Sequence, residues 1–155
     1  MTYEVKLTEL ATTTAAHLRI HTRTADIGDA VGQGFKELYE FAGRADAVPT
    51  GPPQLAYPGG FDPHGEMDLD LYVPISTAPA ANGGIDIVDL PGGPAAQTFH
   101  HGRYQEIRAA YEAVFTLIHR NGHHHAGPPR ESYLNGTESG LDGHLTEVVV
   151  PLRRS

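Results

Sequence analysis

The hydrophobic and polar positions along the chain predict two helices and eight short strands. Apolar residues recur every three or four positions over 27–42 and again over 107–118, which is the spacing of one face of an α-helix. The remaining apolar segments are short and are bounded by glycine and proline, as strands are. They lie near 3–10, 15–22, 53–58, 66–75, 84–90, 95–101, 129–134 and 145–152.

The ends of both helices carry recognisable signals. Thr24 or Asp26 is placed to cap the first helix, because a short oxygen-bearing side chain satisfies backbone N–H groups at a helix start. Gly43 and Gly122 lie just past the two apolar patterns, where a left-handed residue often ends a helix.

The chain contains an internal repeat. Residues 51–57 (GPPQLAY) recur 76 positions later at 127–133 (GPPRESY), and the YVPI segment at 72–75 recurs as VVPL at 149–152. Each of the two helical patterns lies upstream of one Gly-Pro-Pro. We therefore expect two similar halves that span approximately residues 1–76 and 84–153.

These elements predict an α+β fold within a single domain, residues 1–155. Each half supplies a β-α-β-β unit, and the short strands pair into a mostly antiparallel sheet with both helices on one face. The repeat implies a pseudo-two-fold relation between the halves, with a ligand cleft at the centre.

Composition narrows the function classes. The net charge is −8 and lysine and arginine are scattered, so we expect no direct binding of nucleic acid. The absence of cysteine excludes thiolate zinc sites and cysteine nucleophiles. No secretory leader or apolar run of membrane-spanning length occurs, so the expected location is the cytoplasm, away from the membrane. We expect no cofactor.

Two acidic residues are candidates for a ligand site. Alternation along 66–75 places Asp70 and Tyr72 on the face opposite the apolar residues, and the repeat makes Asp70 the counterpart of Glu147. Glu147 has leucine and valine as neighbours on its own face, so partial desolvation would make its carboxylate an attractor for a cation. The alternative is a solvated glutamate on an exposed face.

Tyrosines and a second glutamate accompany these acids. Glu131 and Tyr133 share one face of their strand, and Tyr57 is the counterpart of Tyr133 in the first half. Paired tyrosines would wall a cleft that suits flat or cationic ligands, although they would equally complete a core.

The histidines favour structural roles. His100 ends a strand and either lines a pocket or packs locally. The run 123–125 cannot direct three adjacent side chains at one ion, so we expect solvated loop residues and no metal site. No serine lies in a nucleophile-elbow motif.

Four ordered motifs make the chain similar to a known family. They are Asp89–Gly93, His100–Tyr104, Pro129–Leu134 and Thr146–Val148. In this set the chain resembles the GyrI-like small-molecule-binding family, whose domain is also the effector-binding half of AraC-type and multidrug-responsive regulators. The resemblance implies a duplicated strand-helix-strand-strand fold with a central cleft. It also implies that Glu147 meets the ligand, with Glu131, Tyr133 and Tyr104 nearby.

The resemblance leaves three functions open. The first is a standalone protein that binds a hydrophobic, possibly cationic or drug-like molecule. The second is a hydrolase that opens strained cyclopropane-containing compounds with Glu131 and Glu147 as acid and base. The third is a protein-binding module like the family's gyrase inhibitors. Arg103 stands where the family usually has proline, and tryptophan is absent, so the ligand is expected to differ. With no helix-turn-helix before Tyr3, we do not expect this chain alone to bind DNA.

Overall fold

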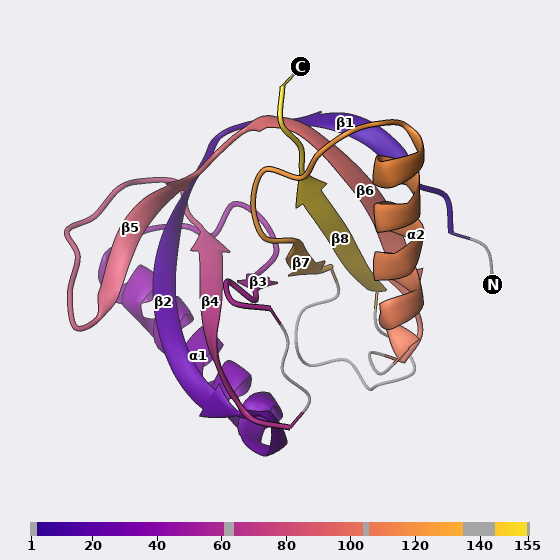
Figure 1. The fold of residues 1–155 in the computed structure, drawn as a ribbon. Coiled ribbons are helices and arrows are strands. Elements are labelled where there is room, and N and C mark those ends of the chain that lie inside the picture. The colour runs from indigo at the N-terminus through magenta and orange to yellow at the C-terminus, as the bar shows by residue number, and fades with distance from the viewer. Residues whose placement is uncertain (1–2, 61–63, 104–105, 135–144, 155) are drawn as a thin grey trace. The chain divides into compact units, whose positions relative to one another are not determined.

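The computed structural model describes residues 3–60, 64–103, 106–134 and 145–154 and confirms the α+β class. Every strand and helix expected from the sequence is present, with ends shifted by a few residues (Figure 1). In chain order the elements are β1 (Lys6–Leu10), β2 (Thr13–Arg23), α1 (Ile27–Arg44), β3 (Gln54–Ala56), β4 (Glu66–Pro74), β5 (Ile85–Leu90), β6 (Gly93–His101), α2 (Arg108–Arg120), β7 (Arg130–Tyr133) and β8 (Leu145–Pro151).

The chain divides into two compact units. Unit 1 comprises Met1–Ala11 and Pro91–Ser155, and unit 2 comprises Thr12–Leu90. The grouping differs from a linear division into halves, because β1 pairs with β6 in unit 1 and β5 pairs with β2 in unit 2. Each unit thus takes one strand from beyond its own repeat.

Unit 1 has four antiparallel strands in the order β1-β6-β8-β7, with α2 packed on one face. Val148 and Val150 of β8 meet Val114 and Ile118 of α2 in a buried apolar cluster. These are the residues that alternation along β8 directs toward the helix. The same register sends Glu147 to the opposite face.

Unit 2 has four antiparallel strands in the order β3-β4-β2-β5 and carries α1. The approach of α1 to β4 is close, because a Cβ built on Gly34 would lie 2.3 Å from Leu71 Cδ1. Leu71 is therefore on the helix-facing side of β4, and Asp70 and Tyr72 alternate to the other side. This is the arrangement that the sequence pattern predicted.

The internal repeat is visible in backbone contacts. Isolated bridges join Pro49 to Ile75 in unit 2 and His125 to Leu152 in unit 1, at equivalent positions of the two repeats. The predicted left-handed residue at Gly122 is confirmed, with φ of 70°.

One prediction about a helix end is wrong, and another is confirmed in position only. Gly43 lies inside α1, which runs on to Arg44, and Asp46 instead takes the left-handed conformation, with φ of 53°. At the start of α1, Thr24–Asp26 forms a 3₁₀ turn, and Asp26 occupies the N-cap position without a side-chain capping hydrogen bond. In the described ranges, neither helix combines the length and the apolar character needed to cross a membrane.

Candidate functional site

A buried glutamate lies beneath α2 in unit 1. Glu131 of β7 pairs with Val148, so its side chain is on the helix-facing side, where it is 1% exposed. The Tyr111 hydroxyl of α2 donates to Glu131 Oε2 at 2.5 Å, and the Tyr133 hydroxyl donates to Oε1 at 2.9 Å. A carboxylate removed from water is costly unless donors compensate it, and here each oxygen accepts from a phenol.

A second polar group occupies the neighbouring cross-strand row. Tyr133, Thr146 and His100 pair side by side on the helix-facing side of the sheet. The Nε2–H of His100 donates to the carbonyl of Arg103 at 2.7 Å, and the Tyr3 hydroxyl lies 2.8 Å from Nδ1. Burial, with the Glu106 carboxylate, raises the pKa of Tyr3, which therefore stays a neutral donor. His100 thus has a local structural partner on each nitrogen.

Thr146 is the exception within this row. It is fully buried, and its Oγ1 makes no hydrogen bond to any described residue. Together with Glu131, Tyr111 and Tyr133, it gives the space beneath α2 a polar character that contrasts with the apolar cluster of Val114, Val148 and Val150 beside it.

The equivalent place in unit 2 is apolar. Counting by the repeat, Phe35 is the counterpart of Tyr111 and Leu55 is the counterpart of Glu131. Phe35 is 2% exposed and Leu55 is 1% exposed, so both complete an ordinary core against α1. Among the residues that the structure describes, only unit 1 therefore carries a buried acid under its helix.

Glu147 and Glu131 are not brought together. Glu147 pairs with Ser132 and Phe99, which places its side chain on the face away from α2. There it is partly exposed and accepts a hydrogen bond from Gln97. The two glutamates proposed as a joint acid and base thus lie on the adjacent strands β7 and β8 and on opposite faces of the sheet.

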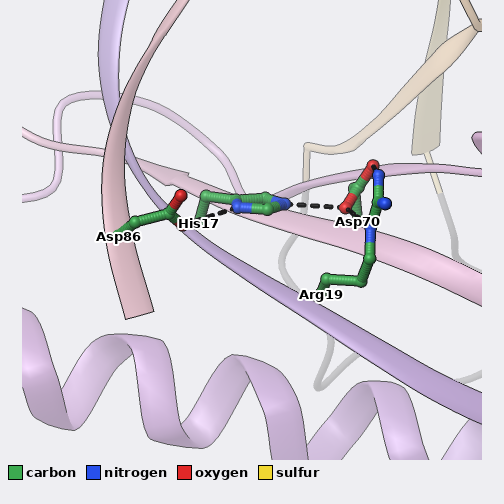
Figure 2. A network of polar contacts seen from close by, with 4 residues as sticks. All are labelled: His17, Arg19, Asp70 and Asp86. Carbon is green, nitrogen blue, oxygen red and sulfur yellow. Dashed lines mark hydrogen bonds and ion pairs between the residues drawn. The ribbon is translucent and has the colours of Figure 1, made fainter. Parts of the chain in front are cut away.

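Asp70 of unit 2 is held by basic side chains (Figure 2). Arg19 donates to both carboxylate oxygens of Asp70 at 2.8 Å, and His17 Nε2 lies 2.7 Å from Oδ1. Burial alone raises the pKa of Asp70, but the hydrogen bonds from Arg19 and His17 outweigh it and leave the pKa below its usual value. The other His17 nitrogen lies 2.7 Å from Asp86. Asp70 is therefore an internal counter-charge.

The remaining predicted site residues are dispersed. Tyr72 packs its ring against His17, with ring centroids 5.0 Å apart, and Tyr57 follows the end of β3, half-buried. Both belong to unit 2. Tyr104 lies outside the described residues. In the described ranges no three potential metal-ligating side chains converge, and His125 of the histidine run contacts the edge of Phe115.

Sequence reasoning missed the partners of these acids. Tyr111 falls within the apolar pattern of 107–118, and only its replacement of Phe35 at the equivalent repeat position marks it as polar where a core residue is expected. His17 and Arg19 alternate along β2 opposite the acids of β4, a period-two charge pattern that predicts cross-strand ion pairs.

Comparison with known proteins gives a family and a fold. The profile of the GyrI-like small molecule binding domain matches residues 3–153. No curated protein sequence shows significant similarity to the chain.

Solved structures with a similar fold include three relevant proteins. EcmrR is 21% identical to the chain over all of its C-terminal domain, with a TM-score of 0.81. The chain spans 58% of the EcmrR polypeptide seen in a DNA complex (20% identity over 99% of this chain, TM-score 0.86). SAV2435, solved with tetraphenylphosphonium, is 19% identical over 99% of this chain and 94% of its own (TM-score 0.62). A hydrolase from Listeria innocua is 12% identical over 97% of this chain and 92% of its own (TM-score 0.67).

Proposed function

Because the chain belongs to the GyrI-like small-molecule-binding family, we propose that it binds a hydrophobic organic cation with Glu131 as the counter-charge. The observation that carries the proposal is the buried carboxylate of Glu131 between the hydroxyls of Tyr111 and Tyr133. Such an acid attracts a cation most strongly when the cation brings little hydration of its own, as a large aromatic cation does.

The geometry favours Glu131 over Glu147 as this acid. Glu147 is partly exposed and hydrogen-bonded to Gln97, so water screens its charge. Glu131 is almost fully buried, and a ligand reaches it only when the side chains that cover it move aside. Its two tyrosines supply aromatic area as well as hydroxyl donors. SAV2435, which shares the fold, was solved with tetraphenylphosphonium, a cation of this class.

The test compares two isosteric variants with one cation. Titration calorimetry with tetraphenylphosphonium should give saturable binding to the wild-type protein and about tenfold or greater weakening in Glu131→Gln, since about 1.4 kcal/mol of lost attraction is a factor of ten. Glu147→Gln, on the opposite face, is the matched control and should bind like wild type. Triphenylphosphine oxide, an uncharged relative, should bind weakly to all three proteins. Loss of binding in Glu147→Gln with retention in Glu131→Gln would refute the assignment.

Hydrolysis is a second candidate, supported by the acid–phenol pairs around Glu131. Glu131 would take a proton from water as the oxygen attacks an electrophilic ring carbon. The ring bond would then break toward a conjugated carbonyl, which a tyrosine hydroxyl protonates. This arrangement replaces the pair of Glu131 and Glu147, which lie on opposite faces. Mass spectrometry of a cyclopropane-containing electrophile after incubation decides between the two functions. If the electrophile gains water no faster with the protein than in buffer alone, the protein only binds it. A faster gain of water that is lost in Glu131→Gln supports hydrolysis.

A further inference from the structure

Unit 2 contains a wide, open depression in its surface, called the cavity below, that is lined by none of the residues discussed for cation binding. Its volume is about 510 Å³, and it opens beside β2 and the turn that leads into β5. The ionisable residues on its wall are His17, Arg19 and Asp86, and residues 81–85 complete it.

Arg19 presents an exposed guanidinium edge to this cavity. Asp70, only 4% exposed, accepts from Nε and Nη2 of Arg19, which fixes the orientation of the planar group. A guanidinium has five N–H groups, so three remain beyond the two that Asp70 uses. The Arg19 side chain is 55% exposed. A carboxylate entering the cavity would therefore meet a donor edge already held in place.

Asp86 presents the opposite charge at the other end of the same chain of contacts. Figure 2 shows His17 between Asp86 and Asp70, with Arg19 beyond Asp70. Both His17 nitrogens lie 2.7 Å from carboxylate oxygens, and both contacts are hydrogen bonds only when each nitrogen carries a hydrogen. His17 thus links the two carboxylates through its ring. Only one oxygen of Asp86 contacts His17 in this pair, and the Asp86 side chain stays 56% exposed.

The exposed groups at the two ends carry opposite charges. Arg19 is positive and 55% exposed, and Asp86 is negative and 56% exposed. A simple anion or a simple cation can therefore pair with only one of the two ends. A molecule that carries both charges can pair with the exposed group at each end.

We propose that this cavity binds a small zwitterion, with its carboxylate on Arg19 and its ammonium on Asp86. An imidazole ring and two hydrogen bonds separate the Asp86 carboxylate from Asp70, to which Arg19 is paired. The ligand's charged groups must span a comparable distance. A dipeptide, whose charges are several bonds apart, fits this spacing better than an α-amino acid does.

The next row of the same strands provides an internal comparison. His21 lies 2.8 Å from Asp68, but both side chains are largely exposed, and neither lines the cavity. An exposed pair of this kind contributes little to binding. Asp68 is therefore a suitable control position for Asp86.

The experiment titrates the full chain with glycylglycine and two blocked peptides, followed by calorimetry and by amide shifts in two-dimensional NMR spectra. Wild type should bind glycylglycine at one site, and N-acetylglycylglycine and glycylglycinamide, which each lack one charge, should bind at least tenfold more weakly. Asp86→Asn should weaken the binding of glycylglycine by a similar factor, and Asp68→Asn should leave this binding unchanged.

Each alternative outcome overturns the proposal. No saturable binding means that the cavity has no zwitterion site, and equal binding of the acetylated peptide means an anion site at Arg19 alone. Equal binding to wild type and Asp86→Asn removes the role given to Asp86. Glu131→Gln, which tests the cation site, should bind glycylglycine normally, so the two proposals fail independently.

Discussion

Exchanging the polar pair of unit 1 for the apolar pair of unit 2 is a direct test of how Glu131 is held. The variants are Tyr111→Phe, Glu131→Leu and the double variant, which copies Phe35 and Leu55 into the equivalent positions. Tyr111→Phe removes one hydrogen bond to a buried carboxylate, which should lower the free energy of unfolding by about 1.5–3 kcal/mol. Glu131→Leu deprives two tyrosine hydroxyls of this acceptor, which costs roughly 1–3 kcal/mol for each buried group, offset in part by the added apolar burial.

The free energy of unfolding of the double variant should be higher than the sum of the two single-variant changes predicts. Replacing a whole buried polar pair with apolar residues of similar volume is often neutral or stabilising, whereas removing one partner is not. We expect a coupling free energy of about 1.5–3 kcal/mol between Tyr111 and Glu131, measured by urea denaturation of all four proteins. The double variant should also lose its response to tetraphenylphosphonium while remaining folded. Single effects that add to within about 0.5 kcal/mol would refute the reasoning, because independent sites behave in that way.

Three further predictions concern unit 2. Gly34→Ala should destabilise the protein by about 1–3 kcal/mol, since its new Cβ meets Leu71 at 2.3 Å, whereas Gly32→Ala, with nothing within 4 Å, should stabilise it by about 0.5–1 kcal/mol in urea melts. The pKa of Asp70 is lowered in the folded state, so its contribution is present above its unfolded pKa of about 3.9 and is lost as the pH falls through the folded value. Asp70→Asn should flatten stability against pH in that acidic range, and an unchanged acid limb would contradict this. A hydrogen bond to Asp68 raises the pKa of His21. The contribution of His21 to the free energy of unfolding is therefore present below about pH 6.5 and is lost as the pH rises. His21→Gln should flatten the dependence of stability on pH in that range.

Much of the fold was predictable because its strands are amphipathic. Alternation along β4 separates Leu71, which faces α1, from Asp70 on the other side, and the same rule sets Val148 apart from Glu147 in β8. A period of two residues determines the face of each side chain without knowledge of the neighbouring strand. The repeat then extended the interpretation from one half to the other.

The candidate site was less predictable because it depends on contacts distant in sequence. The partner of Glu131 is Tyr111, twenty residues away on a helix, and the choice between Glu131 and Glu147 depends on which face of the sheet α2 covers. Alternation along a strand shows which side chains share a face of the sheet, but it does not show how deeply each face is buried. The end of α1 was missed for a local reason, since Asp46 takes a left-handed conformation that is more often assigned to glycine.

The apolar pair of unit 2 also has an evolutionary consequence. A duplicated gene segment gives selection two copies of the same packing position, and a change in one copy does not have to be accepted by the other. Phe35 and Leu55 form an ordinary apolar core, while Tyr111 and Glu131 are polar at the matching positions. Ligand preference can therefore change through substitutions in one repeat, while the packing of the other repeat stays as it is.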